Sequence, residues 1–357
     1  MIEETIDFRQ LNKIFVSEEI DGYESGIELL LIGYGFTDKY GIKMLKEMWK
    51  TVDLDEEAIG RDKKMTMRLC PADMGGCITL LDITPRRQLK VRILAEMNVV
   101  TPMGLCYDDM NNQLLVGGAK SVLTIKGGKL KDSLRNNLFS QVHVISKTSK
   151  GYICANTNTD SIVEFDPRNS TDSIWEWLAT ENGFLENRKG VQRKISREIN
   201  YQIREDYGTM NHTTHINSVL EYREDRVLAT LFHQGQLILI NKKDGSHVVV
   251  FDGMKNPHGV HKTSDGYIVS DTRGGRVVLF DEDLNYKDSI KGDFDWIQDA
   301  IEFKDYYVVG NDNNYRLELY DKNLKQVSSI SWGKDSRKIS SLTSIKAKQA
   351  WNVFKER

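Results

Sequence analysis

Cysteine is scarce in this sequence. The 357-residue chain contains four cysteines, and no two of them have the Cys-x-x-Cys spacing. A zinc knuckle needs such pairs of thiols, so we do not expect one. We expect reduced thiols within strands, although the first two are close enough in sequence to pair under oxidation. The cysteines are Cys70, Cys77, Cys106 and Cys154.

The chain also lacks an excess of charge of either sign. It carries 49 basic and 52 acidic residues, for a net charge of -3. This balance gives no reason to expect nucleic acid or an anionic membrane as a partner. The sequence indicates no oligomeric state.

Long apolar runs are missing as well. No stretch is long enough to cross a bilayer, and the acidic start, Met1 to Thr5, lacks the basic end and apolar run of a secretory signal. We expect a cytoplasmic protein.

A repeat is the main feature that is present. Residues 141–153 align without a gap with residues 256–268, and the match continues from 161–166 to 276–281. Similar runs begin near residues 101, 214, 297 and about 340, so the units are spaced by roughly 40 residues, as in four-stranded propeller blades. Each unit alternates apolar and polar residues and ends in turn residues. The sequence therefore predicts an all-β, six-bladed β-propeller over residues 67–357.

Two regions depart from the repeat. Residues 1–66 are expected to form a small α/β extension, with a strand at 27–32 and a helix at 37–52. Residues 167–212 are expected to be an insertion that acts as a lid or binding loop, and its basic stretch 188–199 suits either an anion or a solvated surface helix. The last strand has too few followers to complete a blade, so we expect N-terminal strands, near 74–95, to close the ring.

Histidines share one phase of the repeat. Because the first strand of each propeller blade lines the central channel, residues at one phase converge near the axis. We expect Asn217 and Asp299 to lie close to this ring of channel residues. The predicted ring consists of Met103, His143, His215, His258 and Gln298.

Such a cluster admits three chemistries. His143, His215 and His258 could ligate one divalent metal ion with an open position, as in a metal-dependent lyase or hydrolase. One neutral histidine could instead attack an anion while other groups stabilise the charge. The histidines could also simply bond to one another and to water in a polar channel. A different class remains open, a non-catalytic propeller that binds a partner protein through its rim or the insertion.

Three stretches resemble arylsulfotransferase-type propellers, which belong to the arylsulfate sulfotransferase group and move a sulfuryl group between phenols without a nucleotide donor. The stretches span about residues 140–285. They are Asp160 to Asp166 leading to the Trp-Glu-Trp element at 175–177, His-Ile-Asn-Ser-Val at 215–219, and His-Gly-Val-His at 258–261 with Asp265 to Asp271.

The resemblance implies an enzyme without a cofactor that acts on a small aromatic or natural-product-like molecule. It implies that His258 is the transiently sulfated nucleophile and that His215 and Asn217 hold the sulfuryl oxygens. The family's arginine on the next strand is missing here. Candidate substrate-binding residues are His143, Met103, Gln298 and Asp299 from the ring, Arg273 and Arg276 as substitutes for that arginine, and Trp175 and Trp177 as stacking residues.

Overall fold

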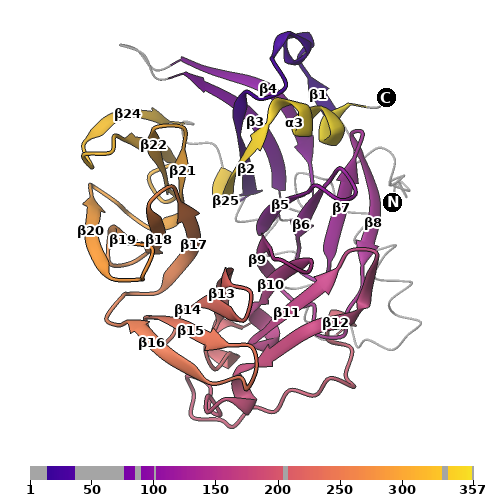
Figure 1. The fold of residues 1–357 in the computed structure, drawn as a ribbon, viewed down its shortest axis with the longest axis vertical. Coiled ribbons are helices and arrows are strands. Elements are labelled where there is room, and N and C mark those ends of the chain that lie inside the picture. Colours follow the sequence, from indigo (N-terminus) through magenta and orange to yellow (C-terminus); the bar gives the residue numbers. More distant parts are fainter. Residues whose placement is uncertain are drawn as a thin grey trace, which may run out of the picture.

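Six sheets surround a central axis (Figure 1). The computed structural model describes residues 14–36, 76–84, 90–99, 102–203, 208–331 and 337–355. Within these residues, five sheets have four antiparallel strands and the sixth has five. The predicted six-bladed β-propeller is confirmed.

Blades 1 to 5 follow the chain. Blade 1 contains β5 (Gly104–Asp108), β6 (Gln113–Gly117), β7 (Val122–Lys126) and β8 (Lys129–Leu134). Blade 2 contains β9 (Val142–Lys147), β10 (Tyr152–Asn156), β11 (Ser161–Asp166) and β12 (Asn169–Leu178), with η3 (Thr157–Thr159) after β10. Blade 3 contains β13 (Ile216–Arg223), β14 (Arg226–Leu231), β15 (Gln236–Asn241) and β16 (His247–Phe251).

The next two blades have the same order. Blade 4 contains β17 (Pro257–Thr263), β18 (Gly266–Asp271), β19 (Arg276–Phe280) and β20 (Tyr286–Lys291). Blade 5 contains β21 (Ile297–Phe303), β22 (Tyr306–Asn311), β23 (Arg316–Tyr320) and β24 (Gln326–Ser331). In each of these blades the first strand is innermost, and it contacts the first strands of the neighbouring blades.

Blade 6 joins both ends of the chain. Its strand order is β25-β2-β3-β4-β1, so the C-terminal strand β25 (Arg337–Lys346) is innermost. The predicted closure by N-terminal strands is confirmed, because β25 pairs with β2 along its length. The remaining N-terminal elements are β1 (Ile14–Val16), η2 (Glu18–Gly22), β2 (Glu28–Phe36), β3 (Gly76–Thr84) and β4 (Lys90–Asn98).

The helix α3 (Ala347–Phe354) fastens blade 6 to blade 1. The amide of Gly127, in the β7–β8 turn, donates to the Asn352 carbonyl at 2.8 Å, and the Gly128 amide donates to the Val353 carbonyl at 2.7 Å. Apolar clusters fill the space between neighbouring blades all around the ring. Each blade is therefore stabilised mainly by its two neighbours.

The predicted N-terminal extension is partly a propeller blade. The strand expected at 27–32 is β2, which lies between β25 and β3, so the expected boundary at residue 67 does not separate it from the propeller. Its Leu29 to Ile32 run is buried on both faces because helix α3, blade 5 and blade 1 pack against this sheet. The helix expected at 37–52 lies outside the described residues.

The insertion begins later than expected. Residues 169–178 form β12, the outer strand of blade 2, because Trp177 and Leu178 are buried against the neighbouring blade and Phe139. The excursion therefore runs from Ala179 to His215. The stretch 188–199 is irregular rather than helical. The excursion contains the short helices η4 (Ala179–Glu181), η5 (Tyr201–Ile203) and η6 (Thr209–Asn211).

The cysteines and the question of a membrane-spanning helix can be followed only in the described residues. Cys77, Cys106 and Cys154 are free thiols, and Cys70 lies outside the described residues. In the part of the chain that the structure describes, no helix is long and apolar enough to cross a membrane.

Ring closure by β25 gives a test. A chain truncated before Arg337 leaves β2 as an open edge and removes the contacts of α3 with blade 1. We expect this variant to lose the single cooperative transition of the intact chain in near-UV circular dichroism during heating. Removal of only Glu356 and Arg357 is the control and should leave the transition in place. An unchanged midpoint in the longer truncation would contradict this account of closure.

Candidate functional site

Four inner-strand residues share one position at the channel. Each lies on the first strand of its blade, at a shift in the register with which that strand pairs with the second strand. In each blade, the residue just before it pairs with the last residue of the second strand. A bulge of this kind turns a side chain out of the regular alternation. The four residues, one each from blades 2 to 5, are His143, Asn217, His258 and Gln298.

His215 is not a member of this set, although we expected it to be. It precedes β13 and is equivalent to Gln141, Asn256 and Trp296, which also stand two residues before a channel residue. All four have left-handed backbones, with φ of 50° at Gln141, 53° at His215, 56° at Asn256 and 66° at Trp296. His215 and Asn217 are therefore not two steps apart on one regular strand.

The ring of His258 is held through Nδ1. This nitrogen lies 2.7 Å from Thr272 Oγ1 and 3.2 Å from the Asn256 carbonyl oxygen. The Thr272 hydroxyl donates its own proton to the Ile297 carbonyl in blade 5, at 2.7 Å. Because both partners of Nδ1 must accept, we assign the proton to Nδ1. Nε2 then carries the lone pair and has no hydrogen-bond partner among the described residues.

Blade 2 repeats this arrangement at His143. Its Nδ1 lies 2.7 Å from Thr157 Oγ1 and 2.9 Å from the Gln141 carbonyl oxygen. The Thr157 hydroxyl donates to the Ile216 carbonyl of blade 3 at 2.8 Å. The same reasoning places a proton on Nδ1 and a lone pair on Nε2 of His143.

Burial keeps both histidines neutral. Removal from water lowers the pKa of His258 to about 3, with a smaller contribution from the nearby His143. Burial likewise lowers the pKa of His143. The Nε2 lone pairs are therefore available at neutral pH for attack on an electrophile, for accepting a proton or for binding a metal ion.

His215 belongs to a second cluster of rings beside the channel. Its ring stacks on His212 at a centroid distance of 4.9 Å, and the two Nδ1 atoms lie 2.7 Å apart. Its centroid is also 6.1 Å from that of His143 and 4.6 Å from that of Phe232. Burial, followed by the neighbouring histidines, lowers the pKa of His215 well below its usual value.

A buried carboxylate fixes the backbone that carries His215. Asp160 is fully buried and accepts from the amides of Thr213, Thr214 and His215 at 2.7 to 3.0 Å. Arg193 of the excursion pairs with the same carboxylate at 2.9 Å and also donates to the Asn158 carbonyl. The basic stretch of the excursion therefore meets a structural anion inside the protein.

Aromatic side chains flank His258. Its ring lies edge to face with Phe232, at a centroid distance of 5.2 Å, and 6.0 Å from Trp296. The guanidinium of Arg273 lies over Trp296, at 5.3 Å from its centroid. Gln298 accepts a hydrogen bond from the Trp296 indole at 2.8 Å and so orients that ring.

Phe232 and Trp296 were not predicted as site residues. They stand at the ends of strands, where no motif marks them. Their repeat positions carry the only signal, because Phe232 follows β14 as Thr272 follows β18, and Trp296 precedes β21 as Asn256 precedes β17.

Asn217 occupies the channel position of blade 3 itself, where we expected it only to lie close to the ring. Its amide oxygen accepts from Thr230 Oγ1 at 2.8 Å, while the buried Nδ2 has no hydrogen-bond partner in the described part of the chain. A buried donor without a partner is costly, so this group is a candidate for binding an acceptor oxygen of a ligand.

Other predicted substrate-binding residues have structural partners. Asp299 accepts from His261 at 2.7 Å and from the Leu342 amide of blade 6 at 2.8 Å. Arg276 pairs with Asp271 at 2.8 Å, whereas the guanidinium of Arg273 lies over the ring of Trp296. Met103 is half-buried, and its amide bonds to the Gly117 carbonyl in blade 1.

Trp175 and Trp177 lie between blades and away from the channel. Their indole nitrogens donate to the Lys242 and Gly245 carbonyls of blade 3, at 3.0 and 2.9 Å. The expectation that they stack on a substrate at the channel therefore does not hold. They pack blade 2 against blade 3, since Trp177 is 2% exposed.

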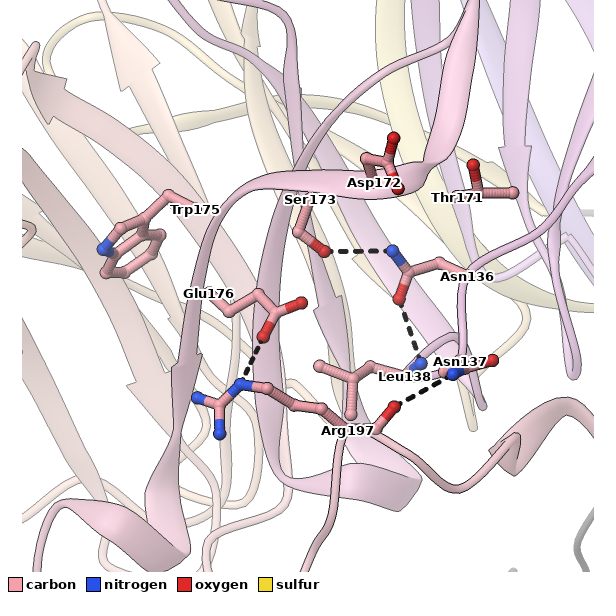
Figure 2. Close-up of a pocket in the computed structure, with 9 residues that line it drawn as sticks. All are labelled: Asn136, Asn137, Leu138, Thr171, Asp172, Ser173, Trp175, Glu176 and Arg197. Atoms are coloured by element: carbon pink, nitrogen blue, oxygen red, sulfur yellow. Dashed lines mark hydrogen bonds and ion pairs between the residues drawn. The ribbon is translucent and has the colours of Figure 1, made fainter.

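A polar pocket of about 580 Å³ lies outside the channel, beside β12 (Figure 2). Several of its polar side chains are already engaged within the protein, as in Arg197 to Glu176 at 2.6 Å and Asn136 to Ser173 at 3.0 Å. We therefore place the candidate site at the channel histidines. The pocket is lined by Asn136, Asn137, Leu138, Thr171, Asp172, Ser173, Trp175, Glu176 and Arg197.

The three predicted metal ligands are near one another but are not grouped as a ligand set. Among the residues that the structure describes, no three His, Cys, Asp or Glu side chains are arranged to hold a metal ion. His215 in particular directs Nδ1 at His212.

Comparisons with known proteins show the fold alone. The sequence matches no protein-family model and no curated protein. The crystal structure of a nidogen/laminin complex is similar to this chain, with a TM-score of 0.55 and 10% identity over 76% of this chain and 95% of that chain. Weaker likenesses are the Pseudomonas aeruginosa periplasmic gluconolactonase PpgL (TM-score 0.45, 12% identity, 76% and 81% covered) and the Staphylococcus aureus virginiamycin B lyase (0.43, 11%, 65% and 70%). These structures are β-propellers, and at such identities they assign no activity to this chain.

The Asp160 carboxylate gives a stability test. Asp160→Ala leaves Arg193 and several backbone amides buried without their partner. We expect the free energy of unfolding, measured with urea, to fall by about 3–5 kcal/mol. The control is Asp166→Ala, which breaks an exposed pair with Arg168 and should cost no more than about 1 kcal/mol. Equal losses in both variants would contradict the role given to Asp160.

Proposed function

We propose that this chain is an enzyme that transfers a sulfuryl-type group between small aromatic molecules, with His258 as the nucleophile. One observation carries the proposal: the Nδ1 of His258 is committed to two acceptors, which leaves a neutral ring with its lone pair on Nε2. The resemblance of residues 215–219 and 258–261 to arylsulfotransferase-type propellers supports the same assignment. No cofactor is needed for this chemistry.

In the first step Nε2 of His258 attacks the sulfur atom of an aryl sulfate. The new N–S bond forms as the S–O bond to the ring breaks, and the phenolate leaves with the electron pair. The imidazole becomes positively charged, and its Nδ1 proton is stabilised by Thr272 Oγ1 and the Asn256 carbonyl oxygen.

In the second step an acceptor phenol attacks the same sulfur atom. The N–S bond breaks, the new S–O bond forms, and the phenol loses its proton. His258 returns to the neutral form, so donor and acceptor exchange one sulfuryl group and one proton overall.

Binding of the donor uses the groups around His258. Phe232 and Trp296 offer apolar surface for an aromatic ring. We propose that the negatively charged sulfuryl oxygens bind Arg273, which lies over Trp296, and Nδ2 of Asn217, which has no partner within the described residues. Loss of one such donor typically lowers turnover by roughly 10²–10³-fold.

A nucleophilic role for His258 is tested by His258→Ala. We expect turnover of an aryl sulfate to fall by about 10³-fold or more while the thermal unfolding midpoint stays near that of the wild type. After incubation with donor alone, mass spectrometry should find a sulfated His258 in the wild type. His247→Ala, on the outer strand of blade 3, is the matched control and should keep full turnover.

Three results would contradict the proposal. Unchanged turnover in His258→Ala would remove the nucleophile. About one transition-metal ion per purified chain, lost in His143→Ala, would instead favour metal-dependent lyase or hydrolase chemistry. Silent channel variants, together with binding of a protein partner that is lost when the excursion is deleted, would favour a binding propeller.

A further inference from the structure

Asp312 occupies a repeat position that serves the channel in other blades. It directly follows the last residue of β22, as Thr157 follows β10 and Thr272 follows β18. Both threonines at this position bond the channel histidine of their own blade. The Asp312 amide also donates to the Trp296 carbonyl at 2.9 Å, so this residue adjoins the backbone of Trp296, whose ring lies 6.0 Å from that of His258.

One oxygen of the Asp312 carboxyl group is not used in a hydrogen bond by the described residues. Asp312 is only 4% exposed, yet its Oδ1 has no hydrogen-bond partner among the residues that the structure describes. The other oxygen, Oδ2, lies 3.5 Å from Lys338 Nζ in β25, and that amine also donates to Asn313 at 2.6 Å. A buried oxygen without a partner is rare in folded proteins and points to a ligand or substrate group at this place.

The surroundings of Asp312 favour its protonated form. Burial raises the pKa of Asp312 to about 6, against the opposing effects of Lys338 and the Ile339 amide. Lys338 is the charged group that acts on it within the described part of the chain. The carboxyl group can therefore give up and regain a proton near neutral pH.

We propose that Asp312 is the general acid and base of the transfer: it protonates the departing phenolate and later takes the proton of the incoming phenol. This inference rests on the proposed function. In the first step the Asp312 proton moves to the phenolate oxygen as the S–O bond breaks, which leaves a carboxylate. In the second step the acceptor phenol gives its proton to that carboxylate as the N–S bond breaks. No other proton source is required.

The assignment makes the effect of Asp312 depend on the leaving group. 4-Nitrophenolate is a weak base and departs without protonation, whereas unsubstituted phenolate is more basic and benefits from an acid. We compare single turnovers of 4-nitrophenyl sulfate and phenyl sulfate by wild type, Asp312→Asn and Asp312→Glu. Asp288→Asn, on the outer strand of blade 4, is the control.

Asp312→Asn should lower turnover of phenyl sulfate by about 10²-fold or more and change that of 4-nitrophenyl sulfate by less than about threefold. Asp312→Glu should recover part of the lost rate. Wild-type turnover of phenyl sulfate should fall as the pH rises above about 6, and this limb should be missing in Asp312→Asn.

The outcomes separate the two proposals. Equal losses on both substrates, or none on either, would overturn the role of Asp312 while leaving His258 as nucleophile. If the wild type turns over neither sulfate and His258 is never sulfated, the proposed function fails, and this inference fails with it. Unfolding midpoints of all variants identify any loss that comes from misfolding.

Discussion

The hydroxyl group of Thr272 is the contact on which the candidate chemistry depends. Its single proton forms the hydrogen bond that it donates to the Ile297 carbonyl of the next blade. It can therefore only accept from His258, and this fixes the imidazole with its proton on Nδ1. The packing of blade 4 against blade 5 thus determines which nitrogen of His258 is free. Thr157 does the same for His143 across blades 2 and 3, so one interblade contact occurs twice with the same consequence.

Ring closure keeps these contacts in register. Each inner strand contacts the next, and β25 completes the circle by pairing with β2. Asp299 shows the dependence directly, since its carboxylate accepts one hydrogen bond from His261 in blade 4 and another from the Leu342 amide in blade 6. A change in how blade 6 packs would therefore move Asp299, and with it Gln298 and Trp296, which stand just before Asp299 in the chain. The N-terminal strands matter to the site although none of the candidate site residues lies on them.

The sequence predicted most of the fold and part of the site, and the differences have physical causes. The gapless repeat contained His143 and His258 at equivalent places, and the structure keeps them equivalent. His215 was aligned by residue type, but the excursion ends in a left-handed turn at that residue, which shifts the channel position to Asn217. Nothing in a period-two pattern reveals such a bulge.

Loop residues and tryptophans were harder still to predict. Trp296 and Asp312 lie at strand ends, where only comparison with other blades shows their direction. Trp175 was expected at the channel because aromatic residues suit both ligands and packing. The structure resolves this ambiguity, since its indole bonds to a carbonyl of the next blade.

One property of the channel, its separation from water, acts on two groups in opposite chemical senses. Desolvation disfavours whichever form of a group is charged. For His258 the neutral form is the base, so its pKa falls to about 3, and for Asp312 the neutral form is the acid, so its pKa rises to about 6. At pH values between these two, His258 carries an unprotonated nitrogen and Asp312 a protonated carboxyl group. A nucleophile and an acid can coexist there without exchanging a proton, because transfer from Asp312 to His258 would create two charges in a place that disfavours both.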